Sequence, residues 1–344
     1  MSEVLYRKYR PTTFADVVGQ DAVVKTLEAQ VANGTVGHAY LFAGSRGTGK
    51  TSIARILAKQ LGTTANDIYE IDAASKTSVD DIRELNESVN TLPFDSKYKV
   101  YILDEVHMLS KSASNAFLKT LEEPPEHVIF ILATTETHKI PETILSRCEI
   151  HTFKKPNQET LKKVVMNVAK KEGYVIGESS AELIALLGDG SFRDTLGTLQ
   201  KVLSSAKGKK VSEEEVLLVT GAPKGELVNT IVSGITEKDL KKTLTAVREA
   251  TDANLDMSVV LKLLLQKLRA VLLVRFGSTD MVKHDLSEED FTFISKIAND
   301  KNVTIGSDTL IKLLDAYTAT ARAYIPSLPL ELALVEIIGD SKPV

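Results

Sequence analysis

The sequence predicts an α/β domain, with a parallel sheet and flanking helices, followed by two helical domains. Two short runs, 100–103 and 128–133, are strongly apolar and β-branched, as expected of strands buried on both faces of a parallel sheet. Segments with helical spacing separate the strand signals, which is typical of an α/β domain. After about residue 155 the strand signals fade. At roughly 100–200 residues a domain, 344 residues allow two or three domains.

The elements of the α/β region follow from apolar runs and from glycine punctuation. The run Ala39-Tyr40-Leu41-Phe42-Ala43 is a short strand that ends at Gly44. The predicted elements, in chain order, are a strand over 39–43, a helix over 51–61, a strand over 68–71, a helix over 79–89 and strands over 100–103 and 128–133.

The pattern of apolar residues predicts helices for the remainder of the chain, after about residue 155. Residues 159–220 predict three or four short helices, and the chain from 226 onward predicts five or six more. A Gly-Ala-Pro turn at 221–223 marks a boundary between them. We therefore predict domains over 1–155, 156–222 and 223–344.

Composition excludes several classes of protein. The net charge of −4 and the pI of about 6.0 exclude a wholly basic nucleic-acid-coating protein. A single cysteine, Cys148, excludes an intrachain disulfide and a four-cysteine zinc site. The most apolar segment, 259–274, is short and carries Lys262, Lys267 and Arg269, so we expect no membrane span. We expect a cytoplasmic protein.

The strongest motif is a glycine-rich loop between a predicted strand and a predicted helix. Its eight residues fit G-x-x-x-x-G-K-[ST]: Gly44, Ser45, Arg46, Gly47, Thr48, Gly49, Lys50 and Thr51. The glycines let backbone N–H groups face phosphate oxygens, and the following helix contributes its positive end. We expect Lys50 to reach the β- and γ-phosphates and Thr51 to offer its hydroxyl to Mg²⁺. The alternative is a strand–helix turn with an incidental lysine.

Two carboxylates, Asp104 and Glu105, follow the strand over 100–103. Ligands of α/β sheets lie beyond such strand ends. Asp104 suits the Mg²⁺ shell, partly through water, and Glu105 suits the deprotonation of an attacking water. This second carboxylate favours an ATP hydrolase over a module that only binds nucleotide. The alternative is a strand that ends in solvated charge.

Three further positions are weaker candidates. Thr134 and Thr135 follow the strand over 128–133, and a hydroxyl there could bond the γ-phosphate or the attacking water. Arg193 opens a helix after Gly190 and could reach back to the γ-phosphate. Arg147 is ambiguous by itself. A solvated surface arginine is the alternative for both. His107 suits a structural role beside the sheet better than a catalytic one.

The order of these motifs carries a family resemblance. The motifs are Tyr9-Arg10-Pro11, Val18-Gly19-Gln20, the loop over 44–51, the Asp-Glu-Val-His-Met-Leu run at 104–109, Leu-Glu-Glu-Pro-Pro at 121–125, Ala133-Thr134-Thr135, Ser146-Arg147-Cys148 and Gly-Ser-Phe-Arg-Asp at 190–194. The chain resembles clamp loaders of the AAA+ class, in particular the bacterial DNA polymerase III gamma/tau family. The resemblance covers roughly residues 1–200.

The resemblance implies a P-loop AAA+ domain, a helical lid and an all-α collar. It implies ATP and Mg²⁺ as cofactors, with Walker A residues Lys50 and Thr51 and Walker B residues Asp104 and Glu105. It also implies a first sensor at Thr135, with Thr134 as the second choice, a second sensor at Arg193, and an Arg147 that acts on ATP bound by a neighbouring subunit. The residues expected to line the adenine pocket are Tyr9, Arg10, Pro11 and Val18.

The resemblance further implies an ATPase motor of the polymerase holoenzyme that loads a sliding clamp and does not itself polymerise DNA. Its partners would be delta- and delta-prime-like subunits in a pentameric ring, the clamp and primer–template DNA. Lys76 and Arg83 occupy positions of DNA-facing basic residues, and Lys111 is a further candidate. Alternatives are a replication factor C-like small subunit, another AAA+ remodeller, a nucleotide-regulated scaffold and a P-loop kinase.

One departure from the family pattern is large. The family usually carries four zinc-binding cysteines after the Walker A helix, whereas here only 62–67, Gly-Thr-Thr-Ala-Asn-Asp, joins that helix to the next strand. We expect no structural zinc. The chain's end near 344 suggests a gamma-like short form.

Overall fold

The computed structural model describes residues 3–75, 78–283, 288–300 and 305–339. The chain divides into two compact units, one of Met1–Val168 with Glu182–Gln200 and the other of Ala169–Ala181 with Lys201–Val344. The boundaries of the division fall inside helices α7 (Gln158–Lys171), α8 (Glu178–Leu187) and α9 (Phe192–Ser205).

A five-stranded parallel sheet forms the centre of the first unit. Its strands are β1 (Ala39–Ala43), β2 (Ile68–Asp72), β3 (Lys99–Asp104), β4 (Val128–Thr134) and β5 (Glu149–Thr152), in the order β2-β3-β4-β1-β5. The predicted parallel sheet is therefore confirmed. Strand β5 was not predicted, because its four residues include Glu149, His151 and Thr152 and give no apolar run.

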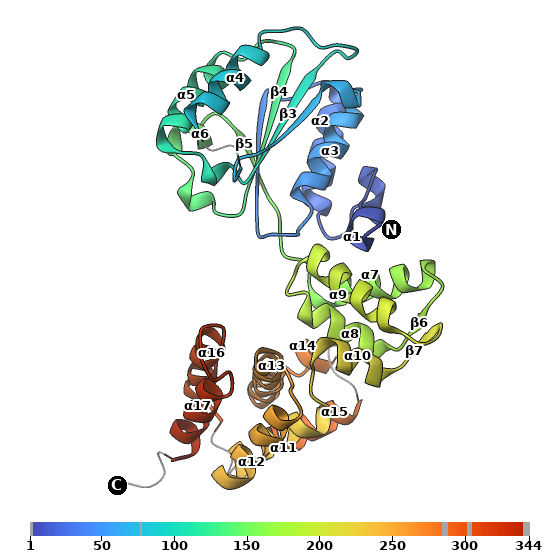
Figure 1. The fold of residues 1–344 in the computed structure, drawn as a ribbon, viewed down its shortest axis with the longest axis vertical. Helices are drawn as coiled ribbons and strands as arrows, with labels where there is room; N and C mark the ends of the chain where they lie inside the picture. Colours follow the sequence, from blue (N-terminus) through green and yellow to red (C-terminus); the bar gives the residue numbers. More distant parts are fainter. Residues whose placement is uncertain (1–2, 76–77, 284–287, 301–304, 340–344) are drawn as a thin grey trace. The chain divides into compact units, whose positions relative to one another are not determined.

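Helices cover both faces of this sheet (Figure 1). Helices α2 (Asp21–Asn33) and α3 (Lys50–Gln60) share a core with Tyr40 and Phe42 of β1. Helices α4 (Val79–Ser88), α5 (Lys111–Glu122) and α6 (Glu142–Leu145) share a second core with Ala39 and Leu41. Alternate residues of β1 thus point to opposite faces, and burial on both sides explains its unbroken apolar run.

The short connection between α3 and β2 is held by a buried carboxylate. Asp67 is fully buried and accepts hydrogen bonds from the backbone N–H groups of Phe94 at 2.6 Å, Asp95 at 2.9 Å and Ser96 at 2.9 Å. Burial by itself would raise the pKa of Asp67, but these hydrogen bonds outweigh it and the pKa is lowered. Asp67 therefore binds the loop before β3 as an anion.

Two helical segments complete the first unit. The N-terminal helix α1 (Leu5–Lys8) is joined to α9, since the Leu5 N–H donates to the Gln200 side chain at 3.0 Å. Helix α7 (Gln158–Lys171) begins five residues after Phe153, a core residue of the α2–α3 face.

The second unit is almost entirely helical. Its one sheet among the described residues pairs β6 (Val175–Ile176) with β7 (Lys210–Val211), a short parallel contact that was not predicted. The helices are α10 (Glu213–Thr220), α11 (Gly225–Glu237), α12 (Leu240–Asp252), α13 (Met257–Arg275), α14 (Asp280–Lys283), α15 (Glu288–Asn299), α16 (Ser307–Thr320) and α17 (Leu328–Gly339).

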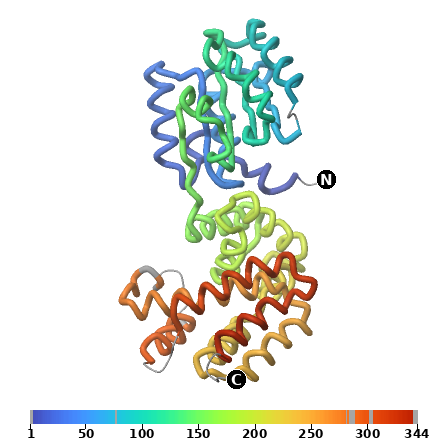
Figure 2. Tube along the Cα trace, turned by 90° about the vertical axis from the view of Figure 1, so that its left-hand side faces the viewer, coloured from blue at the N-terminus to red at the C-terminus, as the bar shows by residue number. Residues whose placement is uncertain are grey.

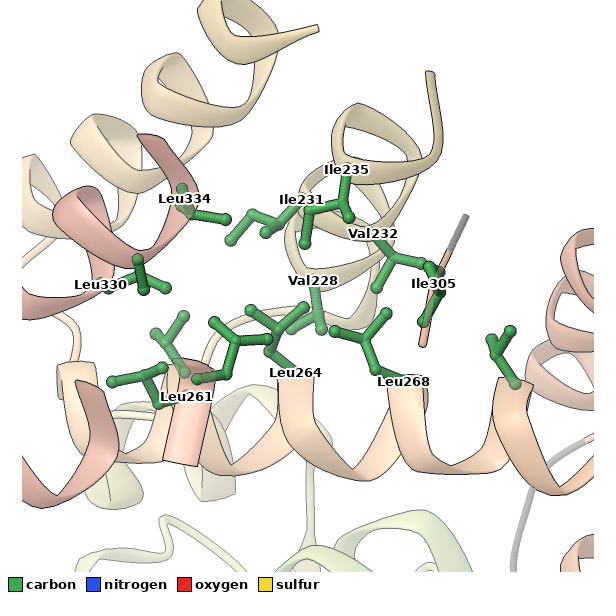
Figure 3. Packing of buried hydrophobic residues seen from close by; sticks show 14 of the residues in the cluster. Val228, Ile231, Val232, Ile235, Leu261, Leu264, Leu268, Ile305, Leu330 and Leu334 are labelled. Atoms are coloured by element: carbon green, nitrogen blue, oxygen red, sulfur yellow. The ribbon is translucent and has the colours of Figure 1, made fainter. Parts of the chain in front are cut away.

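Helix α13 is the centre of this bundle. Leu261, Leu264 and Leu268 point from it into an apolar core shared with α11 and α17 (Figure 3). Helices α16 and α17 pack side by side (Figure 2). In the described part of the chain, no helix combines the length and the apolar character that crossing a membrane requires.

Candidate active site

The glycine-rich loop connects β1 to α3 in a backbone conformation that few side chains tolerate. Gly47 and Gly49 have φ of 72° and 104°. A Cβ on Gly44 would lie 2.5 Å from the Phe153 carbonyl oxygen. Lys50 is the first residue of α3 and is 6% exposed; its ammonium donates to the carbonyl oxygens of Gly44 at 2.7 Å and Ser45 at 2.9 Å.

The loop fits a bound phosphate. Ser45 Oγ is buried and has no hydrogen-bond partner among the described residues. Thr48 is buried and donates its hydroxyl to the Ser45 carbonyl at 2.9 Å, whereas Arg46 is exposed. Burial lowers the pKa of Lys50, while the Glu105 and Asp104 carboxylates oppose that shift. An anion at the positive end of α3 would satisfy Ser45 and Lys50 together.

Thr51 and Asp104 meet beside this loop. The Thr51 hydroxyl donates to Asp104 Oδ2 at 2.9 Å, which joins the start of α3 to the end of β3. No group of three or more His, Cys, Asp or Glu residues able to hold a metal occurs in the described ranges. A hydroxyl and one carboxylate nevertheless suit Mg²⁺, which commonly takes its remaining ligands from water and substrate phosphates.

Glu105 lies next to Thr135. It has a left-handed backbone, φ 51°, immediately after β3. Its Oε2 accepts a hydrogen bond from the Thr135 hydroxyl at 3.0 Å and a longer one from the Thr135 N–H at 3.3 Å. Thr134 is fully buried, and its hydroxyl lies 3.1 Å from His107 Nδ1. Of the two candidate sensors, Thr135 is therefore the one hydrogen-bonded to Glu105.

His107 joins the same network. Its side chain is 7% exposed, with Nδ1 at 3.4 Å from Glu105 Oε2 and Nε2 at 3.1 Å from Glu136 Oε2. Lys139 donates to the same Glu136 oxygen at 2.8 Å. Sequence reasoning assigned His107 a structural role and did not connect it to Glu105. The only available signal was its position two residues after that carboxylate.

Arg193 lies at the start of α9, which contacts the loop. The Phe192 N–H donates to the Gly47 carbonyl at 2.9 Å, and the Arg193 guanidinium carbon is 5.9 Å from the centre of the Tyr6 ring. The positive charge of Arg193 contributes to the lowered pKa of Lys50, after burial, which is the largest cause. The structure thus brings Arg193 into the electrostatic range of Lys50.

The segment expected to line the adenine pocket lies at the N-terminus. Tyr9, Arg10 and Pro11 follow α1 and are half-buried, whereas Val18 is 48% exposed. The sequence predicted no role for Gln20, which appears only as the last residue of the Val18-Gly19-Gln20 motif. Its buried amide donates to the carbonyls of Thr48 at 3.3 Å and Lys154 at 2.8 Å, so it links this segment to the loop.

The other predicted residues lie apart from the loop. Arg147 forms an ion pair with Glu122 and donates to the Thr143 carbonyl at 2.6 Å; among the described residues, none of its hydrogen bonds or ion pairs reaches residues 44–51. Arg83 pairs with Asp80 at 2.9 Å on α4. Lys111 is exposed at the start of α5. Lys76 lies outside the described residues.

Two family profiles match the chain. Residues 19–74 and 62–157 match "DNA polymerase III, delta subunit", and residues 211–342 match "DNA polymerase III subunits gamma and tau domain III". The chain is also similar to a solved structure of the Thermotoga maritima RuvB Holliday junction branch migration motor. That likeness has a TM-score of 0.54 and 24% identity, and covers 67% of this chain and 80% of RuvB. It shows that the fold is of the AAA+ kind.

Curated relatives extend over most of the chain. DNA polymerase III subunit tau of Bacillus subtilis is 39% identical over 79% of this chain and 52% of its own length. The tau subunit of Escherichia coli is 38% identical over 80% of this chain and 46% of its own length, so the chain spans about half of these two relatives. DNA polymerase III subunit gamma of Buchnera aphidicola is 36% identical over 79% of both chains. The chain therefore belongs to the DNA polymerase III gamma/tau family.

Proposed function

We propose that the chain is the ATP-hydrolysing motor subunit of a DNA polymerase III clamp loader, which loads a sliding clamp onto primed DNA. The observation that carries this proposal is the group of Lys50, Thr51, Asp104 and Glu105 around one glycine-rich loop. Family membership supplies the replication setting.

Nucleotide binding follows from the loop. The backbone N–H groups of residues 44–49 would surround the phosphates, and Lys50 would exchange its two carbonyl partners for phosphate oxygens. Thr51 and Asp104 would hold Mg²⁺, partly through water. ATP, when bound, would supply the phosphorus atom that water attacks, and Mg²⁺ would neutralise the charge that develops on the phosphate oxygens.

Hydrolysis requires a base, and Glu105 takes this role. Thr135 fixes one oxygen of the Glu105 carboxylate, which leaves the other to orient and deprotonate a water. Thr135 thereby senses the γ-phosphate through the same network. Arg193 at the start of α9 provides positive charge and couples the lid to the nucleotide state.

Arg147 serves the neighbouring subunit. Its contacts are with α5 and α6, away from its own loop, as a residue acting across a subunit boundary requires. We propose a pentameric ring with delta- and delta-prime-like subunits, and contacts to primer–template DNA through Arg83, Lys111 and Lys76. The protein would work in the cytoplasm, without zinc, as an AAA+ domain over 1–155, a lid over 156–222 and a collar over 223–344.

The test compares Glu105→Gln with Glu84→Gln, a matched change of an exposed glutamate on α4. Glu105→Gln removes the base and keeps its size, so ATP binding should persist while hydrolysis falls by roughly 10²–10⁴-fold. Glu84→Gln should hydrolyse ATP normally. In the assembled complex, primed DNA and a sliding clamp should jointly raise the ATPase rate. Near-normal turnover by Glu105→Gln would refute its role, and the absence of joint stimulation would refute clamp loading.

A further inference from the structure

The side chain of Arg147 is held by groups of its own chain. Its Nη2 donates to Glu122 Oε1, and its Nη1 donates to the Thr143 carbonyl at 2.6 Å and to Ser146 Oγ at 3.3 Å. Among the described residues, no hydrogen bond engages the Nε–H of Arg147, and the side chain is 32% exposed. The guanidinium therefore keeps its charge and at least one N–H donor for a further acceptor.

The backbone around Arg147 is fixed on both sides. Before it, the Arg147 N–H donates to the Ile144 carbonyl of α6 at 3.1 Å. After it, the carboxylate of Glu149, the first residue of β5, accepts two hydrogen bonds from the Gln30 amide of α2, at 2.7 and 2.8 Å. Little freedom is left in the main chain, so the direction of the guanidinium depends on the contacts of the side chain itself.

The place of Glu122 follows from the local sequence. Glu122 is the last residue of α5, and the two prolines at 124–125 prevent the helix from continuing. Its neighbour Leu121 is fully buried and shares a core with Ile144 of α6. Helices α5 and α6 are thereby packed against each other (Figure 1), which brings the Glu122 carboxylate to Arg147.

We propose that Glu122 is a positioning residue for Arg147, which holds the guanidinium in the direction that meets the γ-phosphate of ATP on a neighbouring subunit. This inference rests on the trans role of Arg147 proposed above. An unpaired arginine adopts many rotamers, and ordering such a side chain when two subunits meet costs free energy. Glu122 reduces this cost in advance, because its carboxylate and the Thr143 carbonyl together fix both Nη atoms.

The exposure of this ion pair makes the proposal testable without unfolding the chain. The side chains of Arg147 and Glu122 are 32% and 48% exposed, and ion pairs at such exposure contribute little to stability. Glu122→Gln keeps the size of the side chain and removes its charge, so the fold should persist while the contact with Arg147 weakens. Glu123→Gln is the matched control, because Glu123 is also exposed and, in the described part of the chain, its carboxylate has no hydrogen bond or ion pair.

The first measurement is steady-state ATP hydrolysis by the assembled complex with primed DNA and a sliding clamp. Glu122→Gln should lower kcat roughly 3–10-fold, which is the cost of ordering one long side chain, with little change in KM. Glu123→Gln should leave both constants unchanged. Circular dichroism verifies the fold of each variant. An unchanged or raised kcat in Glu122→Gln would overturn the proposal.

Mixed complexes distinguish positioning from a general structural role. Lys50→Ala chains supply an intact Arg147, and Arg147→Ala chains supply an intact loop. Glu122→Gln should lower the recovered hydrolysis when it is added to the Lys50→Ala chains, and should have no effect when it is added to the Arg147→Ala chains. Equal losses from both placements would show a structural role and overturn the proposal.

The same mixtures separate this inference from the proposed function. If the Lys50→Ala and Arg147→Ala chains recover no activity while Glu122 is intact, the trans role of Arg147 is refuted, and the positioning role falls with it. If activity recovers but does not respond to Glu122→Gln in the Lys50→Ala chains, the trans role stands and only the inference about Glu122 is overturned.

Discussion

Gly47→Ala should destabilise the first unit by pushing α9 away from the phosphate loop. Gly47 has φ 72°, where an alanine costs roughly 1 kcal/mol. A Cβ there would also lie 2.0 Å from Ser191 Oγ and 3.0 Å from Ser191 Cβ. Ser191 is 5% exposed, and its Oγ accepts the Asp194 N–H at 3.2 Å as the cap of α9.

The cap sets the size of the effect. Ser191 cannot rotate away without losing the cap bond, which is worth about 1 kcal/mol. Together with the backbone cost, Gly47→Ala should lower the free energy of unfolding by roughly 2–3 kcal/mol. Gly62→Ala is the matched control, because Gly62 has φ 78° and an added Cβ meets nothing within 4 Å. Gly62→Ala should lower the free energy of unfolding by the backbone contribution alone, roughly 1 kcal/mol.

Urea unfolding followed by circular dichroism measures these differences, with hydrogen exchange of peptides from α9 as the local readout. A second variant background distinguishes the backbone strain at residue 47 from the steric clash with Ser191. Ser191→Gly removes both contacted atoms and caps a helix nearly as well, so in that background Gly47→Ala should cost no more than Gly62→Ala. Equal costs of Gly47→Ala in both backgrounds would show that the loop and α9 do not contact as described.

Three further results are expected. Asp67→Asn should lower the free energy of unfolding by about 2–3 kcal/mol at pH 7, because the carboxylate accepts hydrogen bonds from three N–H groups. Folding lowers the pKa of Asp67, so the stability that the carboxylate contributes is lost only at low pH. The urea midpoints of the variant and the parent should therefore converge only as the pH falls below about 4. His107→Asn should lower kcat roughly 10–100-fold with little change in KM, since Glu105 loses one neighbour that fixes it; an unchanged kcat would refute this. Arg147→Ala subunits mixed with Lys50→Ala subunits should regain partial ATPase activity above either variant alone, whereas no recovery in assembled mixtures would exclude a trans role.

The sequence by itself determined four of the five strands of the sheet and the position of the glycine-rich loop. Continuous β-branched runs require burial on both faces, and this requirement is local enough to predict strands β3 and β4. The spacing of Gly44, Gly49 and Lys50 likewise predicts the loop, because its backbone conformation depends on residues that are adjacent in the sequence. The proximity of Thr51 and Asp104 followed from the rule that parallel strands end at one edge.

Only the tertiary structure decided which side chains meet. Thr134 and Thr135 are indistinguishable in sequence, but Thr134 is buried as the last residue of β4, whereas Thr135 lies just beyond the strand and donates to Glu105. His107 joined the network only when the end of β3 was set beside the end of β4. Arg7 and Arg10 line one pocket with Arg55 of α3, and no local pattern encodes a contact across 45 or more residues. Periodicity fixes an element and its buried face, whereas the distances between elements depend on the packing of the whole core.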